Sequence, residues 1–193
     1  LCLASYKPLN QYEWSSSLLV TNEIKDVFTR QIIEPNKEAN LKNFLPLLED
    51  INDKVSLKVR EQYESSPYPR WVNLRLELKP ASISKVISEI KLKIFDDNII
   101  KVKAPDILIA GCGTGQHSIE TAARYKDSKV LAIDLSISSL SYAKRKTEEL
   151  SIENIDYLQA DILDLGKLDR QFDIVESVGV LHHLDEPTAG WWM

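Results

Sequence analysis

The first 110 residues contain no glycine, and the whole chain of 193 residues has only two cysteines and no long apolar run. Cys2 and Cys112 lie far apart, so a disulfide framework is unsupported, no metal site is expected, and a reducing cytoplasm fits best. No apolar stretch approaches the roughly 18 residues of a membrane-spanning helix. The amino end lacks the basic and apolar segments of a signal peptide. We therefore expect a globular chain that neither spans a membrane nor is secreted.

Charge is distributed unevenly along the chain. Residues 1–105 carry 16 basic and 14 acidic side chains, whereas residues 106–193 carry 8 and 15, for a formal net charge of -5. An acidic carboxyl-terminal half repels a nucleic-acid backbone, and the nearly neutral amino-terminal half is no general phosphate-binding surface. Nucleic acid is therefore a poor candidate partner.

The part of the chain without glycine is predicted to be helical. Glycine supplies turns with positive φ, so its absence suits helices separated by prolines. Apolar residues recur at helical spacing over residues 24–32, 55–63 and 83–94, and each stretch predicts an amphipathic helix. We expect these helices to be interrupted at the prolines of this region, Pro35, Pro46, Pro67, Pro69 and Pro80.

From residue 106 onward, short apolar runs alternate with helical segments. Strands are predicted at 107–110, 130–133, 155–158 and 172–175, and helices at 119–125 and 137–150. This alternation specifies parallel βαβ units. The predicted fold class is therefore α/β, with a Rossmann-like, doubly wound, mainly parallel sheet preceded by a helical amino-terminal segment. Such sheets bind ligands at the carboxyl ends of their strands.

The first predicted strand leads directly into a glycine-rich turn and then a helix. Gly111 permits the tight turn, Gly113 lets the backbone approach a ligand closely, and the amides that open the helix suit an anionic group. The alternative is a purely structural turn. A dinucleotide fingerprint needs glycine or alanine at position 116, where this chain has Gln116 and its third glycine one place early, at Gly115. Nicotinamide binding is thereby disfavoured but not excluded.

Two aspartates end the second and third predicted strands. Asp134 follows Gly111 by 23 residues, close to the roughly 20 expected for a carboxylate that accepts hydrogen bonds from ribose. Its alternative role is a helix cap. Asp161 could read the same adenosine, with Ile162 against the base, although taken alone it fits a solvated turn residue.

The stretches DILIAGCGTGQHSIETA, VLAIDLS, IDYLQADILDL and FDIVESVGVLHHL resemble the successive motifs of class I S-adenosylmethionine-dependent methyltransferases, from residue 106 to about 184. The resemblance implies that Gly111–Gly113 pass beneath the methionine part of the cofactor, Asp134 binds the ribose, and Asp161 with Ile162 holds the adenine. The cofactor-binding set that it implies is Gly111, Cys112, Gly113, Gly115, Gln116, Asp134, Leu135, Asp161, Ile162 and Ser177.

An upstream segment, QYESSPYPRW at residues 62–71, is similar to one that precedes this domain in a bacterial subgroup often fused to tetratricopeptide repeats. The repeats themselves are absent. We expect a helical segment over residues 1–80 and a cofactor-binding domain over residues 81–193. The side chains of the motif form either an aromatic, basic lid over the site or a pin that holds the helical segment to the sheet; they are Tyr63, Tyr68, Arg70 and Trp71.

Methyl transfer from a sulfonium needs alignment more than acid–base help, but a hydroxyl or protonated amine acceptor must lose a proton. The candidates are His182 and His183, just beyond the fourth strand, and His182 is our predicted catalytic residue. The alternative is that one histidine packs under the following segment and the other is solvated. His117, after the glycine loop, is expected to shape the cofactor pocket.

The predicted function is S-adenosylmethionine-dependent methyl transfer to an unidentified small-molecule or protein acceptor. The alternatives are a non-catalytic adenosyl-cofactor-binding or scaffolding module and an NAD-dependent oxidoreductase. The resembled sheet has seven strands, whereas only four are predicted here, so the chain reads as truncated after about four strands. We expect Trp191 and Trp192 to be exposed at an open edge.

Overall fold

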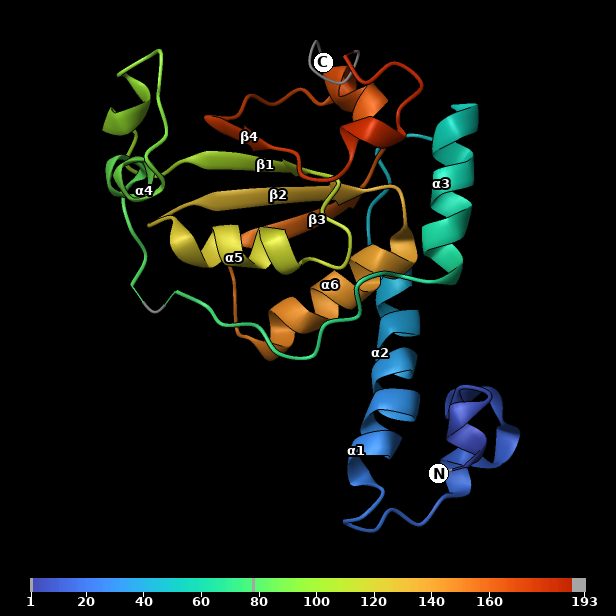
Figure 1. Ribbon diagram of the computed structural model, residues 1–193. Helices are drawn as coiled ribbons and strands as arrows, with labels where there is room; N and C mark the ends of the chain where they lie inside the picture. Colours follow the sequence, from blue (N-terminus) through green and yellow to red (C-terminus); the bar gives the residue numbers. More distant parts are fainter. Residues whose placement is uncertain (1, 78, 189–193) are drawn as a thin grey trace. The chain divides into compact units, whose positions relative to one another are not determined.

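The computed structural model describes residues 2–77 and 79–188. Its contacts divide the chain into two units, Leu1–Phe44 and Leu45–Met193, drawn in Figure 1. The first unit is helical, and its elements are the 3₁₀ turns Leu3–Ser5, Leu9–Gln11, Glu13–Ser17 and Lys42–Phe44, the helix α1 (Lys25–Phe28), the π turn Thr29–Ile33 and the helix α2 (Glu34–Leu41).

Pro35 does not interrupt this helix, contrary to our expectation. It lies in the first turn of α2, directly after the π turn Thr29–Ile33. Proline lacks an amide hydrogen, and its ring crowds the carbonyl four residues earlier, which here belongs to Gln31. The π turn widens the backbone at that carbonyl, so the helix continues through the proline.

Gln31 is the polar residue in the apolar stripe of residues 24–32, and it has a structural role. Its side-chain amide donates to the carbonyl of Ala4 at 3.0 Å, and its side-chain oxygen accepts from the amide of Leu9 at 3.2 Å. The glutamine therefore ties the amino-terminal 3₁₀ turns to the helix within this unit.

The second unit begins with two helices that have side-chain caps. Helix α3 (Lys54–Ser65) starts at Asp53, whose carboxylate accepts from the amides of Val55 and Ser56 at 2.9 and 2.8 Å. Helix α4 (Ile83–Ile90) starts at Ser82 and ends at Lys91, which has a left-handed φ of 55°. It is therefore four residues shorter than predicted, because the left-handed residue closes the helix.

A parallel sheet follows, built from β1 (Asp106–Ala110), β2 (Lys129–Asp134), β3 (Ile155–Gln159) and β4 (Ile174–Glu176). The helices α5 (Gln116–Arg124) and α6 (Ile137–Glu149) connect the first three strands, and the 3₁₀ helices Ile99–Lys101, Ile162–Lys167 and Leu181–His183 complete the unit. The strand order is β3-β2-β1-β4. From β1 the chain proceeds outward through β2 and β3, and it then crosses back to place β4 on the other side of β1. Open α/β sheets bind ligands where the strand order reverses in this way. The predicted Rossmann-like class is confirmed, and β4 begins two residues later and ends one residue later than expected.

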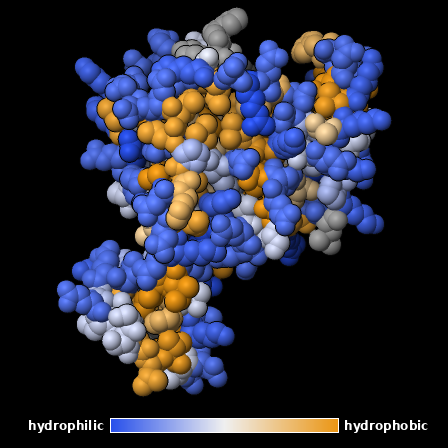
Figure 2. All heavy atoms as spheres, turned by 180° about the vertical axis from the view of Figure 1, so that it is seen from behind, coloured by the Kyte–Doolittle hydropathy of each residue, from blue (hydrophilic) through white to orange (hydrophobic). Residues whose placement is uncertain are grey.

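The sheet has an apolar core on each face. On one face, α4, α5 and α6 pack on the side chains of Ile107, Ile109, Val130 and Ala132. On the other face, Leu108, Leu131 and Ile133 pack with Ile162 and with connecting segments. Val175 pairs in register with Leu108, so it shares this second face, and it is 59% exposed. Figure 2 shows apolar side chains gathered on the side opposite α5 and α6.

Residues 45–80 group with the sheet in these contacts, whereas the sequence places a domain boundary at residue 80. That functional boundary stays a prediction. Trp191 and Trp192 lie outside the described residues. No helix in the described part of the chain is both long and apolar enough to cross a membrane.

Candidate functional site

A cavity of about 320 Å³ opens at the carboxyl ends of the strands. It is walled by the glycine loop, by the ends of β2 and β3, by α3 and by the segment around Leu181–His183. Eight of the ten predicted cofactor-binding residues line it: Gly111, Cys112, Gly113, Gln116, Asp134, Leu135, Asp161 and Ile162. The structure thus brings together residues that are up to 51 positions apart in the sequence, from Gly111 to Ile162.

Gly115 and Ser177 are not among the residues that line this cavity. The hydroxyl of Ser177 donates to the carbonyl of Ala110 at 3.0 Å, which fastens the end of β4 to β1. Gly115 has a φ of +86°, and a Cβ built on it would lie 2.5 Å from the Cβ of Ala143. The third glycine therefore lets α5 approach α6 closely, and both residues support the loop from outside the cavity.

The glycine loop is held by hydrogen bonds from β2. The amides of Gly111 and Cys112 both donate to the carbonyl of Ile133, at 2.9 and 2.8 Å. Gly111 has a φ of +81°, and a Cβ there would meet the side chain of Val180 at 2.2 Å. The thiol of Cys112 is buried, and this burial, followed by the charge of Asp134, raises its pKa well above the usual value. Cys112 is therefore a packed thiol rather than a reactive one.

Asp134 links β2 to the glycine loop. Its Oδ2 accepts from the amide of Gly113 at 2.8 Å, and its Oδ1 accepts from the amide of Ser136 at 2.9 Å. Burial raises the pKa of Asp134, and the hydrogen bonds from these backbone amides partly oppose the rise. The cap of α6 is Ser136, whose hydroxyl accepts from the amide of Ser139. Asp134 is therefore a strand-end carboxylate on the cavity wall rather than the cap of the next helix.

Asp161 is buried, with 2% of its surface exposed, so it is not a solvated turn residue. Its carboxylate accepts from the amide of Leu163 at 3.0 Å at the start of the 3₁₀ helix Ile162–Lys167. Asp161 and Ile162 thus form the wall of the cavity at the end of β3, next to Asp134 at the end of β2.

Helix α3 forms another wall of the cavity. The glutamate of the QYESSPYPRW motif, Glu64, holds this helix in place. Glu64 accepts hydrogen bonds from the hydroxyl of Ser136 at 2.9 Å and from the amide and hydroxyl of Ser138 at 3.0 and 2.7 Å. Ser56, Val59 and Tyr63 line the cavity from this helix. The motif glutamate therefore positions a wall of the site, a role that its sequence did not indicate.

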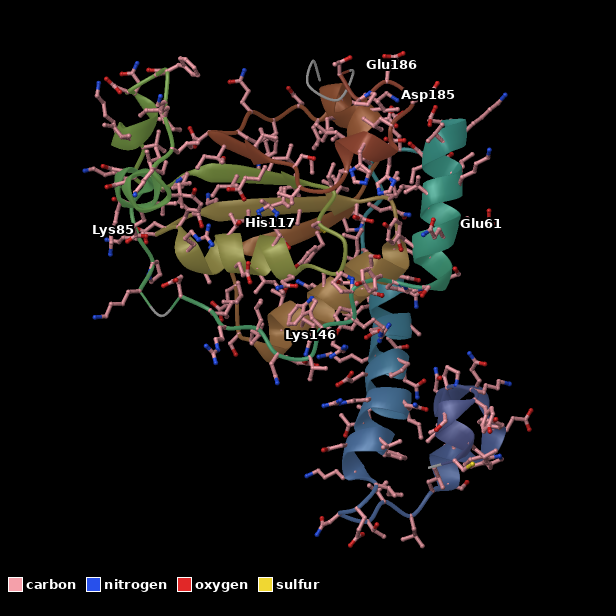
Figure 3. The ribbon with its side chains drawn as sticks, in the orientation of Figure 1. Glu61, Lys85, His117, Lys146, Asp185 and Glu186 are labelled. Carbon is pink, nitrogen blue, oxygen red and sulfur yellow. The ribbon has the colours of Figure 1, made fainter. Side chains whose placement is uncertain are left out.

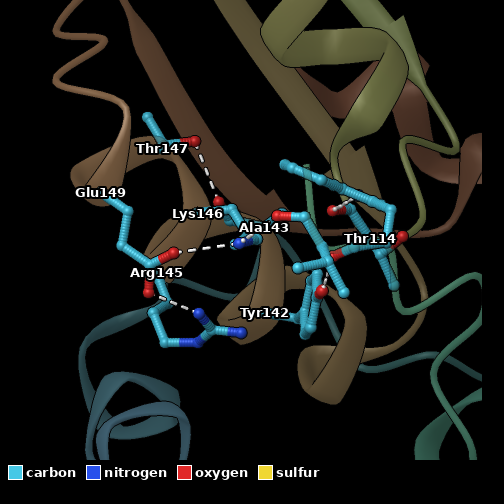
Figure 4. Close-up of polar contacts among 9 residues, drawn as sticks. Thr114, Tyr142, Ala143, Arg145, Lys146, Thr147 and Glu149 are labelled. Atoms are coloured by element: carbon cyan, nitrogen blue, oxygen red, sulfur yellow. Dashed lines mark hydrogen bonds and ion pairs between the residues drawn. The ribbon is translucent and has the colours of Figure 1, made fainter. Parts of the chain in front are cut away.

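Residues 66–72, which we call the strap, run from α3 across the glycine loop. The indole of Trp71 donates to the carbonyl of Thr114 at 3.1 Å, and the hydroxyl of Thr114 donates to the carbonyl of Pro69 at 2.6 Å. The hydroxyl of Tyr142 donates to the carbonyl of Trp71. Figure 4 shows Thr114 and Tyr142 at this junction. The strap is thus bonded to both the glycine loop and α6.

The two predicted roles of the motif are divided among its residues. Tyr63, Tyr68 and Pro69 line the cavity, as a lid would. The guanidinium of Arg70 instead lies 4.6 Å from the ring centre of Tyr142, which pins the strap to α6. Neither Arg70 nor Trp71 is among the cavity-lining residues.

Lys146 completes the junction beneath the strap. It donates to the carbonyl of Val72 at 2.9 Å and to Glu149 at 3.0 Å, and it lies 5.0 Å from the ring centre of Trp71. Burial opposes ionisation of Glu149, but the hydrogen bonds from Arg145 and Lys146 outweigh it and lower the pKa of Glu149. Figure 4 shows both contacts of this carboxylate.

The two adjacent histidines differ in position. His183 lines the cavity, whereas His182, the predicted catalytic residue, does not. The centroids of their rings are 4.1 Å apart. The ring of His183 lies edge-on to that of Tyr63, with 6.3 Å between the ring centroids. Partial burial, followed by the charge of His182, lowers the pKa of His183. The structure therefore places an imidazole with a lowered pKa in the cavity at residue 183.

His117 lines the same cavity and makes a contact that the sequence did not reveal. Its Nε2 lies 2.9 Å from Oε2 of Glu176, the last residue of β4, and the same oxygen accepts from the hydroxyl of Thr121 at 2.9 Å. Figure 3 labels His117 at the start of α5. Burial alone would raise the pKa of Glu176, but the hydrogen bonds from His117 and Thr121 lower it overall. The signal that could have found Glu176 is its place at a strand end.

Within residues 2–77 and 79–188, no group of three or more histidine, cysteine, aspartate or glutamate side chains could hold a metal ion. The described residues that line the cavity offer carboxylates, imidazoles, backbone amides and aromatic rings.

Comparison with known proteins finds similarity to methyltransferases. Residues 107–191 match the family model of a methyltransferase domain. An O-methyltransferase of ubiquinone biosynthesis from Coxiella burnetii is 32% identical over 117 residues, which cover 61% of this chain and 47% of that protein. A tRNA (guanine-N(7)-)-methyltransferase from Helicobacter pylori is 34% identical over 89 residues, which cover 46% of this chain and 22% of that protein.

Among solved structures, magnesium protoporphyrin IX methyltransferase from Synechocystis, with bound SAM, superposes with a TM-score of 0.50 and 22% sequence identity. The superposition covers 74% of this chain and 71% of that chain, and it supports the fold. The chain spans less than half the length of each of the two curated relatives.

Proposed function

We propose that this protein is a class I S-adenosylmethionine-dependent methyltransferase. The observation that carries the proposal is the convergence of three consecutive strand ends on one cavity. The glycine loop follows β1, Asp134 ends β2, and Asp161 follows β3, in the spatial order of the sheet. Carboxylates at two neighbouring strand ends suit the ribose and the adenine of one nucleoside, with Ile162 against the base.

The match of residues 107–191 to a methyltransferase domain supports the same assignment, as do the methyltransferases among its relatives. The acceptor is a small molecule or a protein that remains to be identified. The upstream motif supports membership of the bacterial subgroup that carries QYExxPYPRW before this domain, because Glu64 and Trp71 of the motif bond directly to α6 and to the glycine loop. Both cysteines are free, which supports a reducing compartment such as the cytoplasm.

A histidine beside the cavity supplies the proton acceptor in this proposal. The sequence favours His182, and the cavity wall favours its neighbour His183, whose lowered pKa favours the neutral imidazole that can accept a proton. The remaining walls align the acceptor with the methyl group and exclude water from the transfer.

Calorimetry with S-adenosylmethionine, S-adenosylhomocysteine and NAD tests the cofactor assignment. We expect both adenosyl ligands to bind more tightly than NAD. Tighter binding of NAD, with no heat from either adenosyl ligand, would support the oxidoreductase alternative and overturn the proposal. Transfer of a labelled methyl group to a cell extract then separates an enzyme from a module that binds the cofactor without turnover.

A further inference from the structure

The cavity that we propose to hold the adenosyl cofactor contains few groups for a ligand anion. Its lining includes two carboxylates, Asp134 and Asp161, and two imidazoles, His117 and His183, and none of the described lining residues is a lysine or an arginine. A carboxylate on the ligand is repelled by the two aspartates. Among the described lining residues, an imidazole is therefore the side chain that can bind the ligand carboxylate through an N–H group.

The order of the strands decides where a ligand carboxylate lies. In space the sheet runs β3-β2-β1-β4, so Asp161, Asp134, the glycine loop and Glu176 follow one another along its carboxyl edge. Neighbouring strands are spaced by about 4.8 Å, so β3 and β4 are roughly 14 Å apart. An adenosyl amino acid whose adenine lies at β3 and whose ribose lies at β2 therefore extends past β1 toward β4.

His117 lies at the β4 end of the cavity. Its Nε2 is bonded to Glu176 at 2.9 Å, and Glu176 is held in turn by the hydroxyl of Thr121. This bond fixes the ring and assigns a hydrogen to Nε2, so the second nitrogen, Nδ1, is the one available to another partner. Burial opposes ionisation of Glu176, but the hydrogen bonds from His117 and Thr121 lower its pKa overall, so an ionised carboxylate accepts the hydrogen of Nε2.

The other cavity imidazole is less suited to an anion. Partial burial and the neighbouring His182 lower the pKa of His183, and this disfavours the protonated ring that would pair with an anion. It also lies on the wall formed with Tyr63 of α3, whereas His117 directly follows the glycine loop.

We propose that His117 binds the carboxylate of the amino-acid part of the adenosyl ligand, and that Glu176 is the positioning residue that orients the ring. The inference rests on the proposed function and deepens it, because it assigns the end of the ligand that the two aspartates do not hold. It also gives a role to the contact between β4 and α5.

The test compares S-adenosylmethionine with its decarboxylated form, which keeps the ammonium and the sulfonium and lacks only the carboxylate. Calorimetry on the full 193-residue chain should give about tenfold to a hundredfold tighter binding of the carboxylated ligand. His117→Gln should bring this ratio close to one, because the amide can keep the contact with Glu176 but loses Nδ1. Glu176→Gln should give an intermediate ratio.

Glu120→Gln is the matched control, because it removes a carboxylate from the same helix at a position outside the cavity lining. Its ratio should equal that of the unmodified chain. Circular dichroism checks that each variant is folded. An equal loss of affinity for both ligands in His117→Gln, with an unchanged ratio, would overturn the assignment while leaving the proposed function intact. Absence of binding by either ligand to the unmodified chain would overturn both.

A measurement without any substitution keeps the inference testable if the variants fold poorly. The chain has three histidines, so nitrogen-15 spectra of the imidazoles resolve His117 from the other two. S-adenosylmethionine should move the Nδ1 resonance of His117, and the decarboxylated ligand should leave it near its free position. Equal shifts with both ligands would contradict carboxylate binding at His117.

Discussion

Glu64 accepts two hydrogen bonds from Ser138, one from its backbone amide at 3.0 Å and one from its hydroxyl at 2.7 Å. Ser138 is the second residue of α6, where the backbone amide has no partner within the helix. A carboxylate is also favourable at this end because it faces the positive pole of the helix. One side chain therefore joins α3, a wall of the cavity, to the helix that follows β2.

Replacing this glutamate should loosen the cavity wall. Glu64→Ala removes the acceptor of three hydrogen bonds, and we expect it to lower the free energy of unfolding by about 1.5 to 3 kcal/mol, the range for hydrogen bonds to a charged group. Urea unfolding measures the change. The affinity for S-adenosylmethionine should fall as well, because α3 lines the cavity.

Glu61→Ala is the matched control for this experiment. Glu61 is an exposed carboxylate on the same helix and is labelled in Figure 3. The control should keep the unfolding free energy within about 0.5 kcal/mol of the original chain. If the two variants behaved alike, the contact between Glu64 and Ser138 would contribute nothing measurable to the position of α3.

Gly115→Ala should be strongly destabilising. The new methyl group would lie 2.5 Å from the Cβ of Ala143, and the φ of +86° disfavours any side chain. Overpacking and backbone strain together predict a loss of about 2 to 5 kcal/mol. Gly166→Ala should change little, because nothing lies within 4 Å of a Cβ there. Thermal unfolding of both variants checks the difference.

A second substitution separates the two causes. Ala143→Gly removes the nearest atom that the new methyl group would meet, but the Cα of Ala143 at 3.0 Å and the hydroxyl of Tyr157 at 3.3 Å remain. Adding it to Gly115→Ala should therefore recover part of the overpacking cost and leave the strain of the positive φ. Strict additivity of the two substitutions would mean that the helices do not meet at these residues.

The sequence predicted the strand ends well because local patterns determine them. An apolar run followed by glycine or aspartate specifies where a parallel strand ends, and parallel strands end on one edge of the sheet. Gly111, Asp134 and Asp161 were found in this way. Their meeting in one cavity needs only the fold class, which the alternation of strands and helices provides.

What the sequence did not reveal depends on contacts between distant elements. Glu176 becomes informative only when β4 is placed beside β1, so that a strand end meets His117 on α5. The choice between His182 and His183 depends on the direction in which a short 3₁₀ helix turns its side chains. Pro35 was wrongly taken as a helix end because a π turn that accommodates proline has no simple sequence pattern.

Asp134→Asn should weaken binding of S-adenosylmethionine about tenfold to a hundredfold, because a hydrogen bond to a charged group contributes roughly 1.5 to 3 kcal/mol. The ionised carboxylate is the better acceptor for ribose hydroxyls, so affinity should also fall as the pH falls through the pKa of Asp134. Burial raises this pKa, so the loss begins at a higher pH than for an ordinary aspartate. Calorimetry across pH should give a flatter profile for the variant.

The stability of the ligand-free protein should respond to pH in the opposite direction at this residue. Because the folded-state pKa of Asp134 lies above the unfolded value, its stabilising contribution is complete below the unfolded pKa and is lost as the pH rises through the folded pKa. The difference in unfolding free energy between the original chain and Asp134→Asn should follow this curve. A difference that grew in favour of the original chain with rising pH would contradict the raised pKa.

The two neighbouring histidines give the final prediction, for methyl transfer from labelled S-adenosylmethionine to a hydroxyl acceptor. If His183 accepts the proton, His183→Gln should lower kcat about a hundredfold to ten-thousandfold and remove the acidic limb of the pH profile. A base acts when neutral, so the original rate should fall as the pH falls through the pKa of His183. Burial and the charge of His182 place that pKa below the usual value for histidine. His182→Gln removes the neighbouring charge, so it should move the limb to higher pH while keeping most of kcat. The opposite result would assign the catalytic role to His182. In that case His182→Gln would lose more kcat, and His183→Gln would keep the acidic limb of the pH profile at its original position.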